Sequence, residues 1–260
     1  MSLRVNTNIA AMNAYRNLTV TEGQMGKSLE KLSSGFRINR AADDAAGLVN
    51  SESLRSQIGG LKVASRNAQD GISVAQTAEG ALTEVHSMLQ RMNDLAVQYN
   101  NGTQNTDSQA ALQAEFDALS SEIDRTQTST KFNGVALFGG SATTNFQVGT
   151  DTTDVLAVDL SGSVDTSALD ITDNTTVTDA ITATSTLRGA LGAVQNRFEH
   201  AINNLNVAVE NLSASESRIR DTDMASEMVN FTRANILSQA GTAMLAQANQ
   251  APQSVLQLLR

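Results

Sequence analysis

The most constraining feature of the sequence is an apolar residue at every seventh position along two long stretches of the chain. Seven residues are close to two helical turns, so each row forms one apolar stripe along a helix. The first row consists of Leu54, Leu61, Ala68, Ala75, Leu82, Leu89 and Ala96, and the second of Leu191, Phe198, Leu205, Leu212 and Ile219. The rows predict long helices over about residues 45–99 and 187–219, packed along coiled-coil-like seams.

Shorter helices are predicted beside these long ones. The turn residues Asn100-Asn101-Gly102 end the first long helix, and apolar pairs seven apart predict a helix over 107–126. These two helices should fold back as an antiparallel hairpin. Residues 11–36 and 237–258, near the two ends, each carry one apolar face whose only obvious partner is the other end. We therefore predict that both ends are disordered in the monomer and become ordered on assembly.

The middle of the chain, residues 132–186, is rich in Thr, Ser, Gly and Asp. Residues 145–148 and 155–160 are typical of short strands joined by a turn. The Ser/Thr/Asp-rich residues 161–186 are predicted to form a surface loop or a small insert.

The predicted fold is mainly α. It is a long antiparallel coiled-coil-like helical bundle formed by the N- and C-terminal regions, with a small β-hairpin and no large outer domains. We expect the terminal helices, 1–43 and 220–260, to form an inner coiled coil. Residues 44–219 then form an outer helical domain that includes the β and loop element at 132–186.

Composition and charge exclude several kinds of partner. The 260-residue chain has a formal net charge of −9, whereas phosphate binding favours a basic surface, so nucleic acid is not expected as a partner. The absence of Cys rules out disulfides and thiolate metal sites. Residues 1–21 lack the continuous apolar core of a secretory signal, and no apolar run is long enough to span a bilayer. The default expectation is a cytosolic protein without membrane insertion, unless a specialised export route reads an uncleaved N-terminus.

No catalytic or metal-binding arrangement is predicted. The two histidines, His86 and His200, lie within predicted helices beside Glu84 and Glu199, without the His-Glu-x-x-His spacing of a zinc site. The sequence contains neither a Gly-rich phosphate loop nor a nucleophile elbow. We expect a non-enzyme that uses no cofactor.

Several blocks near both ends of the chain are distinctive. They are VNTNIAA at 5–11, LSSGFRINRAADDAAGL at 32–48, LQRMNDLAVQ at 89–98, FNG at 132–134, SRIRDTDMA at 217–225 and VLQLLR at 255–260. In this order they resemble the bacterial flagellin family, over about residues 1–150 and 187–260. The resemblance implies a structural subunit that is exported by the flagellar type III apparatus and polymerises into the extracellular flagellar filament for motility. It also implies an export chaperone and the filament cap and junction proteins as partners.

Polymerisation is expected to use the apolar faces of the terminal helices. An open filament needs head-to-tail contacts that do not close into a ring, and these faces can supply them. The residues we assign to this role are Leu18, Met25, Leu29, Leu32, Leu237, Met244, Val255, Leu258 and Leu259.

Two further groups of residues are singled out. Asp43 or Asp44 can cap the long helix that follows, with Arg37 and Arg40 within reach of them. In flagellins this block connects the inner helices to the outer domain. The second group is Gln90, Arg91, Leu95, Gln98 and Glu115, where a helical hairpin could bring Glu115 close to Arg91. By resemblance these positions match the surface read by the vertebrate Toll-like receptor for flagellin, which lies between subunits in the filament.

Three other interpretations remain open. A hook–filament junction protein shares the ends and export route of flagellin but is present in few copies. A signalling coiled coil such as a chemoreceptor's cytoplasmic part would need more uniform heptads and no β element. A flagellin carrying a protease insert would need a larger insert with metal ligands.

Overall fold

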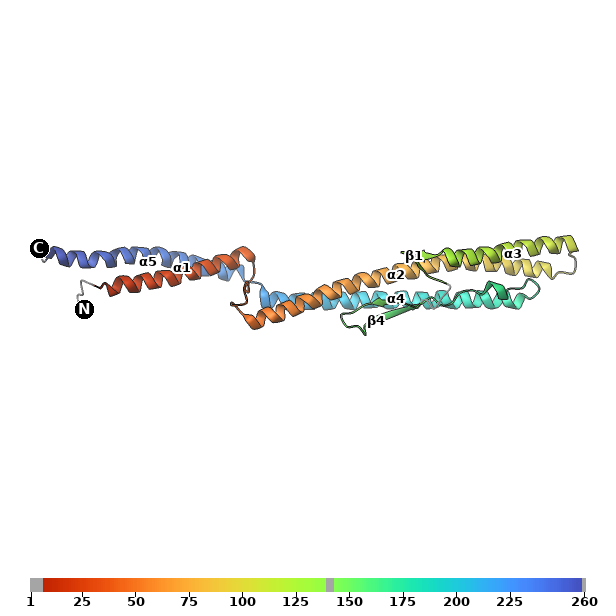
Figure 1. The fold of residues 1–260 in the computed structure, drawn as a ribbon, viewed down its shortest axis with the longest axis horizontal. Helices are drawn as coiled ribbons and strands as arrows, with labels where there is room; N and C mark the ends of the chain where they lie inside the picture. Colours follow the sequence, from red (N-terminus) through yellow and green to blue (C-terminus); the bar gives the residue numbers. More distant parts are fainter. Residues whose placement is uncertain (1–6, 139–142, 259–260) are drawn as a thin grey trace. The chain divides into compact units, whose positions relative to one another are not determined.

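A computed structural model describes residues 7–138 and 143–258, with side chains described to residue 250. Its helices are α1 (Ile9–Ser34), α2 (Ala45–Tyr99), α3 (Thr106–Ser129), α4 (Asn174–Arg220) and α5 (Met224–Leu258). The remaining elements are β1 (Lys131–Phe132), β2 (Val135–Ala136), β3 (Thr143–Gln147), β4 (Val155–Asp159) and the short 3-10 helix η1 (Thr166–Ala168). Figure 1 shows the long helices that dominate the chain, which confirms the mainly helical fold class. Within the described ranges there is no large additional domain.

The chain divides into two compact units. The terminal unit contains Met1–Ser56 and Leu212–Arg260, and the central unit contains Gln57–Asn211. The terminal unit is thus built from sequence segments at opposite ends of the chain.

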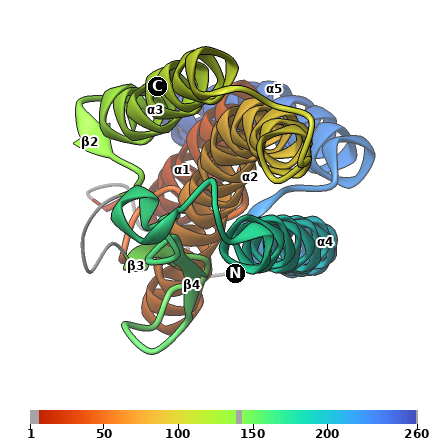
Figure 2. The same ribbon diagram turned by 90° about the vertical axis from the view of Figure 1, so that its right-hand side faces the viewer.

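The long central helix is as the heptad row predicts, because α2 begins at Ala45 and ends at Tyr99. Asp44 fixes its start, since the Asp44 Oδ1 atom accepts a hydrogen bond from the Gly47 N–H at 2.9 Å. After a short loop, Asn105 caps α3 in the same way, accepting from the Ser108 N–H at 2.7 Å. The predicted helical hairpin is therefore confirmed. In the end-on view α2, α3 and α4 lie beside one another in the central unit (Figure 2).

The prediction of a surface loop over 161–186 was wrong from residue 174 onward, because α4 already begins at Asn174. The buried side chains of this segment extend the C-terminal heptad row backwards. They are Val177 and Thr184, both 0% exposed, which lie fourteen and seven residues before Leu191, respectively. Thr184 can be buried because its hydroxyl donates to the Ala180 carbonyl at 2.8 Å. The heptad was present in the sequence but was masked by a composition typical of loops.

Two small antiparallel hairpins follow α3 in the sequence. The pairing of β3 with β4, from Thr143 with Asp159 to Gln147 with Val155, confirms the predicted hairpin. In β4, Leu156 and Val158 face inward and alternate with exposed residues. The β1–β2 hairpin was not predicted. Its two-residue turn, Asn133-Gly134, has positive φ at both positions, as a type I′ turn requires.

The core of the central unit contains two apolar clusters. One joins the middle of α2 to α4 and the β3–β4 hairpin, and at its centre the Phe198 ring meets Phe146 edge-to-face at 5.6 Å. The other joins the C-terminal half of α2 to α3 and the start of α4, around Phe116 and Ile123. These clusters make the central unit independent of the terminal helices for its core.

Gly71 on α2 is where the first cluster is most tightly packed. A Cβ atom placed there would lie 2.5 Å from Phe198 Cζ. We expect Gly71→Ala to lower the free energy of unfolding by about 1–3 kcal/mol, since the ring must move within a packed core. Gly80, on the same helix, has nothing within 4 Å of its Cβ position. Gly80→Ala should therefore stabilise the chain by up to about 1 kcal/mol. Thermal unfolding followed by circular dichroism checks both, and equal shifts for the two variants would contradict the expectation.

Candidate polymerisation site

The candidate site is the helix pair α1–α5 of the terminal unit, whose two helices lie side by side (Figure 1). The residues that form the seam between the two helices are partly or fully buried and step by threes and fours along each helix, which is the spacing of a coiled coil. On α1 they are Ala11, Ala14, Leu18, Thr21, Met25, Ser28 and Leu32, and on α5 Phe231, Ala234, Ser238, Gly241, Leu245 and Ala248. Asn8 caps α1 through the Ala11 N–H and also donates to the Ala248 carbonyl at 2.7 Å.

The seam consists mostly of small residues. Ala, Ser, Thr and Gly occupy more than half of its positions, and the Cβ position of Gly241 lies only 3.3 Å from Leu18 Cδ1. Small residues allow the two backbones to approach closely, but they bury little apolar area per turn. The seam alone is therefore a weak source of stability for two long helices.

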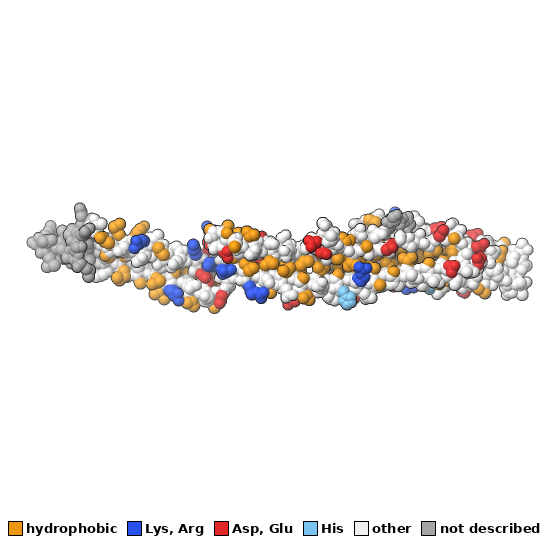
Figure 3. All heavy atoms as spheres, turned by 90° about the horizontal axis from the view of Figure 1, so that it is seen from below, with side chains coloured by type: hydrophobic (Ala, Val, Ile, Leu, Met, Phe, Trp, Pro, Cys, Tyr) orange, Lys and Arg blue, Asp and Glu red, His pale blue; other side chains and the backbone are white. Residues whose placement is uncertain are grey.

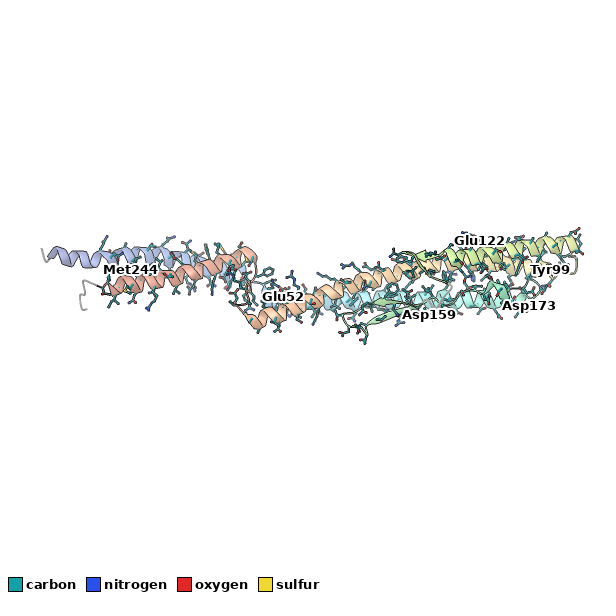
Figure 4. All side chains as sticks on the ribbon, in the orientation of Figure 1. Glu52, Tyr99, Glu122, Asp159, Asp173 and Met244 are labelled. Atoms are coloured by element: carbon teal, nitrogen blue, oxygen red, sulfur yellow. The ribbon has the colours of Figure 1, made fainter. Side chains whose placement is uncertain are left out.

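Large apolar side chains lie outside the seam, on the exposed surface of the pair. Each is at least 48% exposed: Ile9, Met12, Tyr15, Val20, Leu29, Met224, Met228, Val229, Ile236, Leu237 and Met244. Met228, Val229, Ile236 and Leu237 line a shallow groove of about 450 Å³ along α5, together with Thr232 and Arg233. Figure 3 shows apolar side chains on the surface over the terminal helices, and Figure 4 shows Met244 on α5. Contiguous exposed apolar surface of this kind marks an interaction site.

The residues assigned to polymerisation divide into three groups. Leu18, Met25 and Leu32 lie in the seam and hold α1 against α5 within one chain. Leu29, Leu237 and Met244 are 56%, 50% and 64% exposed and so remain free for another molecule. The side chains of Val255, Leu258 and Leu259 lie outside the described residues.

Backbone pairing joins the two segments that lead into the terminal helices. The Arg37 N–H donates to the Arg220 carbonyl at 2.7 Å, and the Thr222 N–H donates to the Gly35 carbonyl at 3.0 Å. Gly35 can end α1 here because its φ of 77° is left-handed. The Arg220 side chain lies 4.9 Å from the Phe36 ring centroid and pairs with Glu52 at 2.7 Å, near the Glu52 label in Figure 4.

The expected contact of Arg37 and Arg40 with the two aspartates is replaced by other partners. The Arg37 guanidinium donates to the Ile219 carbonyl at 2.6 Å, and Arg40 pairs with Glu30 at 2.9 Å. Asp43 instead accepts hydrogen bonds from the backbone N–H groups of Arg40 and Asn39, which lower the pKa of its carboxyl. Asp44 is the residue that caps α2. Backbone groups satisfy both aspartates, which leaves the arginines free to bind elsewhere.

The helical hairpin brings together most of the second group of residues. Arg91 Nη2 lies 2.7 Å from Glu115 Oε1, and Gln90 and Gln98 are exposed. Leu95 does not belong to this surface. It is 0% exposed because it packs against α3 in the second core cluster. The helical face that carries Arg91 turns inward at Leu95, so Leu95 is a core residue.

The described residues contain neither a cluster of metal-ligating side chains nor a helix suited to span a membrane. Among these residues no group of three or more His, Asp or Glu side chains is placed to hold a metal ion. No described helix has both the length and the apolar character needed to cross a bilayer.

Comparison with protein families identifies the terminal helices. Residues 5–143 match the bacterial flagellin N-terminal helical region, and residues 175–259 match the bacterial flagellin C-terminal helical region. The chain belongs to the bacterial flagellin family. The flagellin of Halalkalibacterium halodurans is 55% identical over 98% of this chain and 99% of that protein. The flagellin of Bacillus subtilis is 48% identical over 99% of this chain and 100% of that protein.

A third relative is named for the filament itself. The flagellar filament 33 kDa core protein of Treponema phagedenis is 45% identical over 98% of this chain and 99% of that protein. Flagellins are structural proteins, and the relatives match over nearly their whole length. The match to both flagellin helical regions does not favour the hook–filament junction alternative.

Two sets of residues in this flagellin-family chain were not predicted from the sequence. Val229 and Ile236 are seven apart and face outward in the groove on α5, a second apolar row visible in the sequence. Gln127 is only 7% exposed and forms two hydrogen bonds with the Val164 backbone, at 3.0 and 3.2 Å. Asn100 similarly donates to the Thr172 carbonyl at 3.3 Å. These amides attach the segment from Val164 to Thr172 to the helical hairpin, and no local pattern distinguishes them from exposed polar residues.

Proposed function

We propose that the α1–α5 pair polymerises this chain into the bacterial flagellar filament, in which it serves as a structural subunit for motility and not as an enzyme. The observation that carries the proposal is that α5 is apolar on two faces. One face packs on α1, and the other holds Val229, Ile236 and Leu237 in open contact with solvent. A helix that is apolar on more than one face is typically buried in an assembly.

The energetics favour neighbouring copies as the missing cover. Ordering the backbone costs about 1–2 kcal/mol per residue. Apolar burial returns about 25 cal/mol per Å², and a seam of small residues buries too little to offset that cost alone. Contact with another copy of the chain would bury the exposed apolar side chains and so increase the buried apolar area. Ordering of the helices and assembly should therefore be coupled. Coupling of this kind makes growth cooperative and dependent on a nucleus.

The monomer is therefore expected to have mobile terminal helices. Amide hydrogen exchange should be fast at Leu18 and Met244 in the monomer and slow in the filament, while Leu89 in the central core should be protected in both states. Slow exchange at Leu18 or Met244 in the free chain would contradict the coupling of order to assembly.

We infer the geometry of the subunit contacts from membership of the flagellin family. Head-to-tail contacts that do not close produce an open helical polymer. We place residues 1–43 and 220–260 in an inner tube and residues 44–219 in an outer layer. An uncleaved, unfolded N-terminus would carry the chain through the flagellar export apparatus to the outside of the cell. An export chaperone, the filament cap and the junction proteins would be its transient partners.

A substitution in the groove tests the function directly. Ile236→Asp places a charge where the proposal needs apolar burial, so seeded elongation should fall by at least about tenfold. Ile236→Val keeps the apolar surface and should elongate nearly normally. Electron microscopy of seeded reactions measures filament length for both variants. Filaments of normal length from Ile236→Asp would show that the groove is not part of the interface between subunits. A parent chain that never elongates from seeds would overturn the proposed function.

The exposed Arg91–Glu115 pair supports a second role. We propose that Gln90, Arg91, Gln98 and Glu115 form a surface that contacts subunits in the filament and, in the free monomer, the vertebrate Toll-like receptor for flagellin. All four side chains are exposed on the helical hairpin. The ion pair is solvent-exposed, so removing it should change stability by less than about 1 kcal/mol. The surface can therefore be altered without unfolding the chain.

Arg91→Ala is expected to lower receptor activation by monomer, because it removes the central cation of this surface. The measurement is a receptor-reporter assay with purified monomer at matched concentration. Arg125→Ala is a suitable control, since Arg125 is also exposed and paired with a glutamate, Glu122, on the same hairpin. Unchanged activation by Arg91→Ala would exclude the receptor role.

A further inference from the structure

The chain contains two Asn-Gly pairs, and the structure places them in different surroundings. Asn101-Gly102 lies in the loop between α2 and α3, and Asn133-Gly134 forms the turn between β1 and β2. Both asparagines are exposed. Glycine has no side chain to obstruct its own nitrogen, so each pair is chemically suited to attack of that nitrogen on the asparagine amide. The backbone around each pair then decides whether the attack takes place.

The backbone of Asn133 is held away from attack. Asn133 has a φ of 49° and Gly134 a φ of 81°, and the strands on either side pair through Phe132 and Val135. Ring closure requires the asparagine backbone to rotate until the next nitrogen faces its side-chain carbon. The left-handed turn conformation and the flanking hydrogen bonds resist that rotation.

Core packing reinforces the β1–β2 hairpin. Phe132 packs against the first core cluster, and Leu137 and Phe138, just after β2, are 2% and 4% exposed. The Leu137 N–H also donates to the Thr130 carbonyl at 3.1 Å. Opening the turn far enough for ring closure would disturb these buried residues, so the open state should be rare.

Asn101 has neither the positive φ nor the flanking strand pairing that restrains Asn133. It lies between Tyr99, the last residue of α2 (Figure 4), and Asn105, the cap of α3. Its Oδ1 atom accepts a hydrogen bond from the Thr103 N–H at 3.4 Å. A bond of this length is weak and holds the asparagine side chain only loosely. The Asn101 N–H donates to the Gln98 carbonyl at 3.3 Å, and the Gln104 N–H donates to the Asn101 carbonyl at 3.1 Å. Opening this exposed loop disturbs no buried side chain of the loop itself.

We propose that Asn101 is a site of spontaneous deamidation in the folded chain and that Asn133 is protected. The deprotonated Gly102 nitrogen forms a bond to Asn101 Cγ, the bond from Cγ to the side-chain nitrogen breaks, and ammonia leaves with the proton. Water then opens the cyclic imide to give aspartate or isoaspartate. The loop gains one negative charge, and the isoaspartate product is a substrate for methyltransferases that use S-adenosylmethionine.

Peptide mapping tests this on the intact chain. Trypsin separates the two sites, because cleavage after Arg91 and Arg125 releases residues 92–125, and cleavage after Lys131 and Arg188 releases residues 132–188. Folded chain is kept at mildly alkaline pH and sampled over time by mass spectrometry, with isoaspartyl methyltransferase labelling of the same peptides. Asn101 should convert at least about tenfold faster than Asn133. In chain unfolded by urea the two rates should converge, since both asparagines precede glycine.

A glycine substitution tests the route. Gly102→Ala should slow conversion of Asn101 several-fold by obstructing the attacking nitrogen. It should leave the fold intact, since nothing lies within 4 Å of the added Cβ and the φ of Gly102 is not positive. Gly80→Ala is the matched control and should leave the rate unchanged. Equal rates at Asn101 and Asn133 in the folded chain would overturn the proposal. So would conversion of Asn101 that Gly102→Ala does not slow.

Discussion

Deleting residues 237–260 should abolish filament growth and leave a soluble helical monomer. The deletion removes the exposed Leu237 and Met244, part of the groove on α5, and the seam residues from Ser238 onward. Without them α1 loses most of its partner, and the interface loses apolar area that must offset the cost of ordering. The central unit keeps its own two clusters and should stay folded.

Seeded assembly followed by light scattering and electron microscopy measures this loss. Circular dichroism and thermal unfolding of the truncated chain supply the control, since the core of the central unit must remain folded for the result to concern assembly. Filaments of normal length from the truncated chain would refute the role of α5 in polymerisation. Loss of the central unit's unfolding transition would show that the two units depend on each other for stability.

Phe198→Ala should cause the largest loss of stability in the central unit. Phe198 is 0% exposed, meets Phe146 edge-to-face and packs over Gly71. Truncating a buried phenylalanine to alanine costs about 3–5 kcal/mol, because the transfer free energy is lost and a cavity remains. Urea unfolding of the full chain should show a lower midpoint with an unchanged slope.

Val207→Ala on the same helix is the matched control for this experiment. Val207 is 57% exposed, so its truncation should change the free energy of unfolding by less than about 0.5 kcal/mol. A loss below about 1 kcal/mol for Phe198→Ala would mean that the cluster relaxes around the cavity or that the ring packs differently.

The sequence predicts the long helices well because their signal repeats over many turns. The row through Leu82 and Leu89 predicts α2 to within a residue at each end, and cap residues explain where it starts. The start of α4 was missed because Thr184 occupies a heptad position where a larger apolar residue is usual. Its burial depends on a hydroxyl bonding to its own helix, which a count of apolar residues does not detect.

The candidate site was predicted less completely, for a geometric reason. An apolar stripe identifies residues that become buried, but it does not indicate whether they pack against the same chain or against another copy. Leu18 and Leu29 have similar chemistry, yet one lies in the seam and the other is exposed. Leu95 shows the reverse error, since its spacing from Arg91 suggested a shared surface but α3 covers it. Only the placement of neighbouring helices separates these cases.

The packing of α1 against α5 also affects the order in which the parts of the chain fold. Asn8 bonds to Ala248 across 240 positions of sequence, so the terminal pair closes a loop that encompasses nearly the whole polypeptide. Contacts of such separation form slowly, because the ends must first find each other. During synthesis α1 has no α5 to pack against, so we expect it to remain unfolded until the C-terminal segment has been made. Delayed closure of this kind would favour the export of an unfolded chain that we propose above.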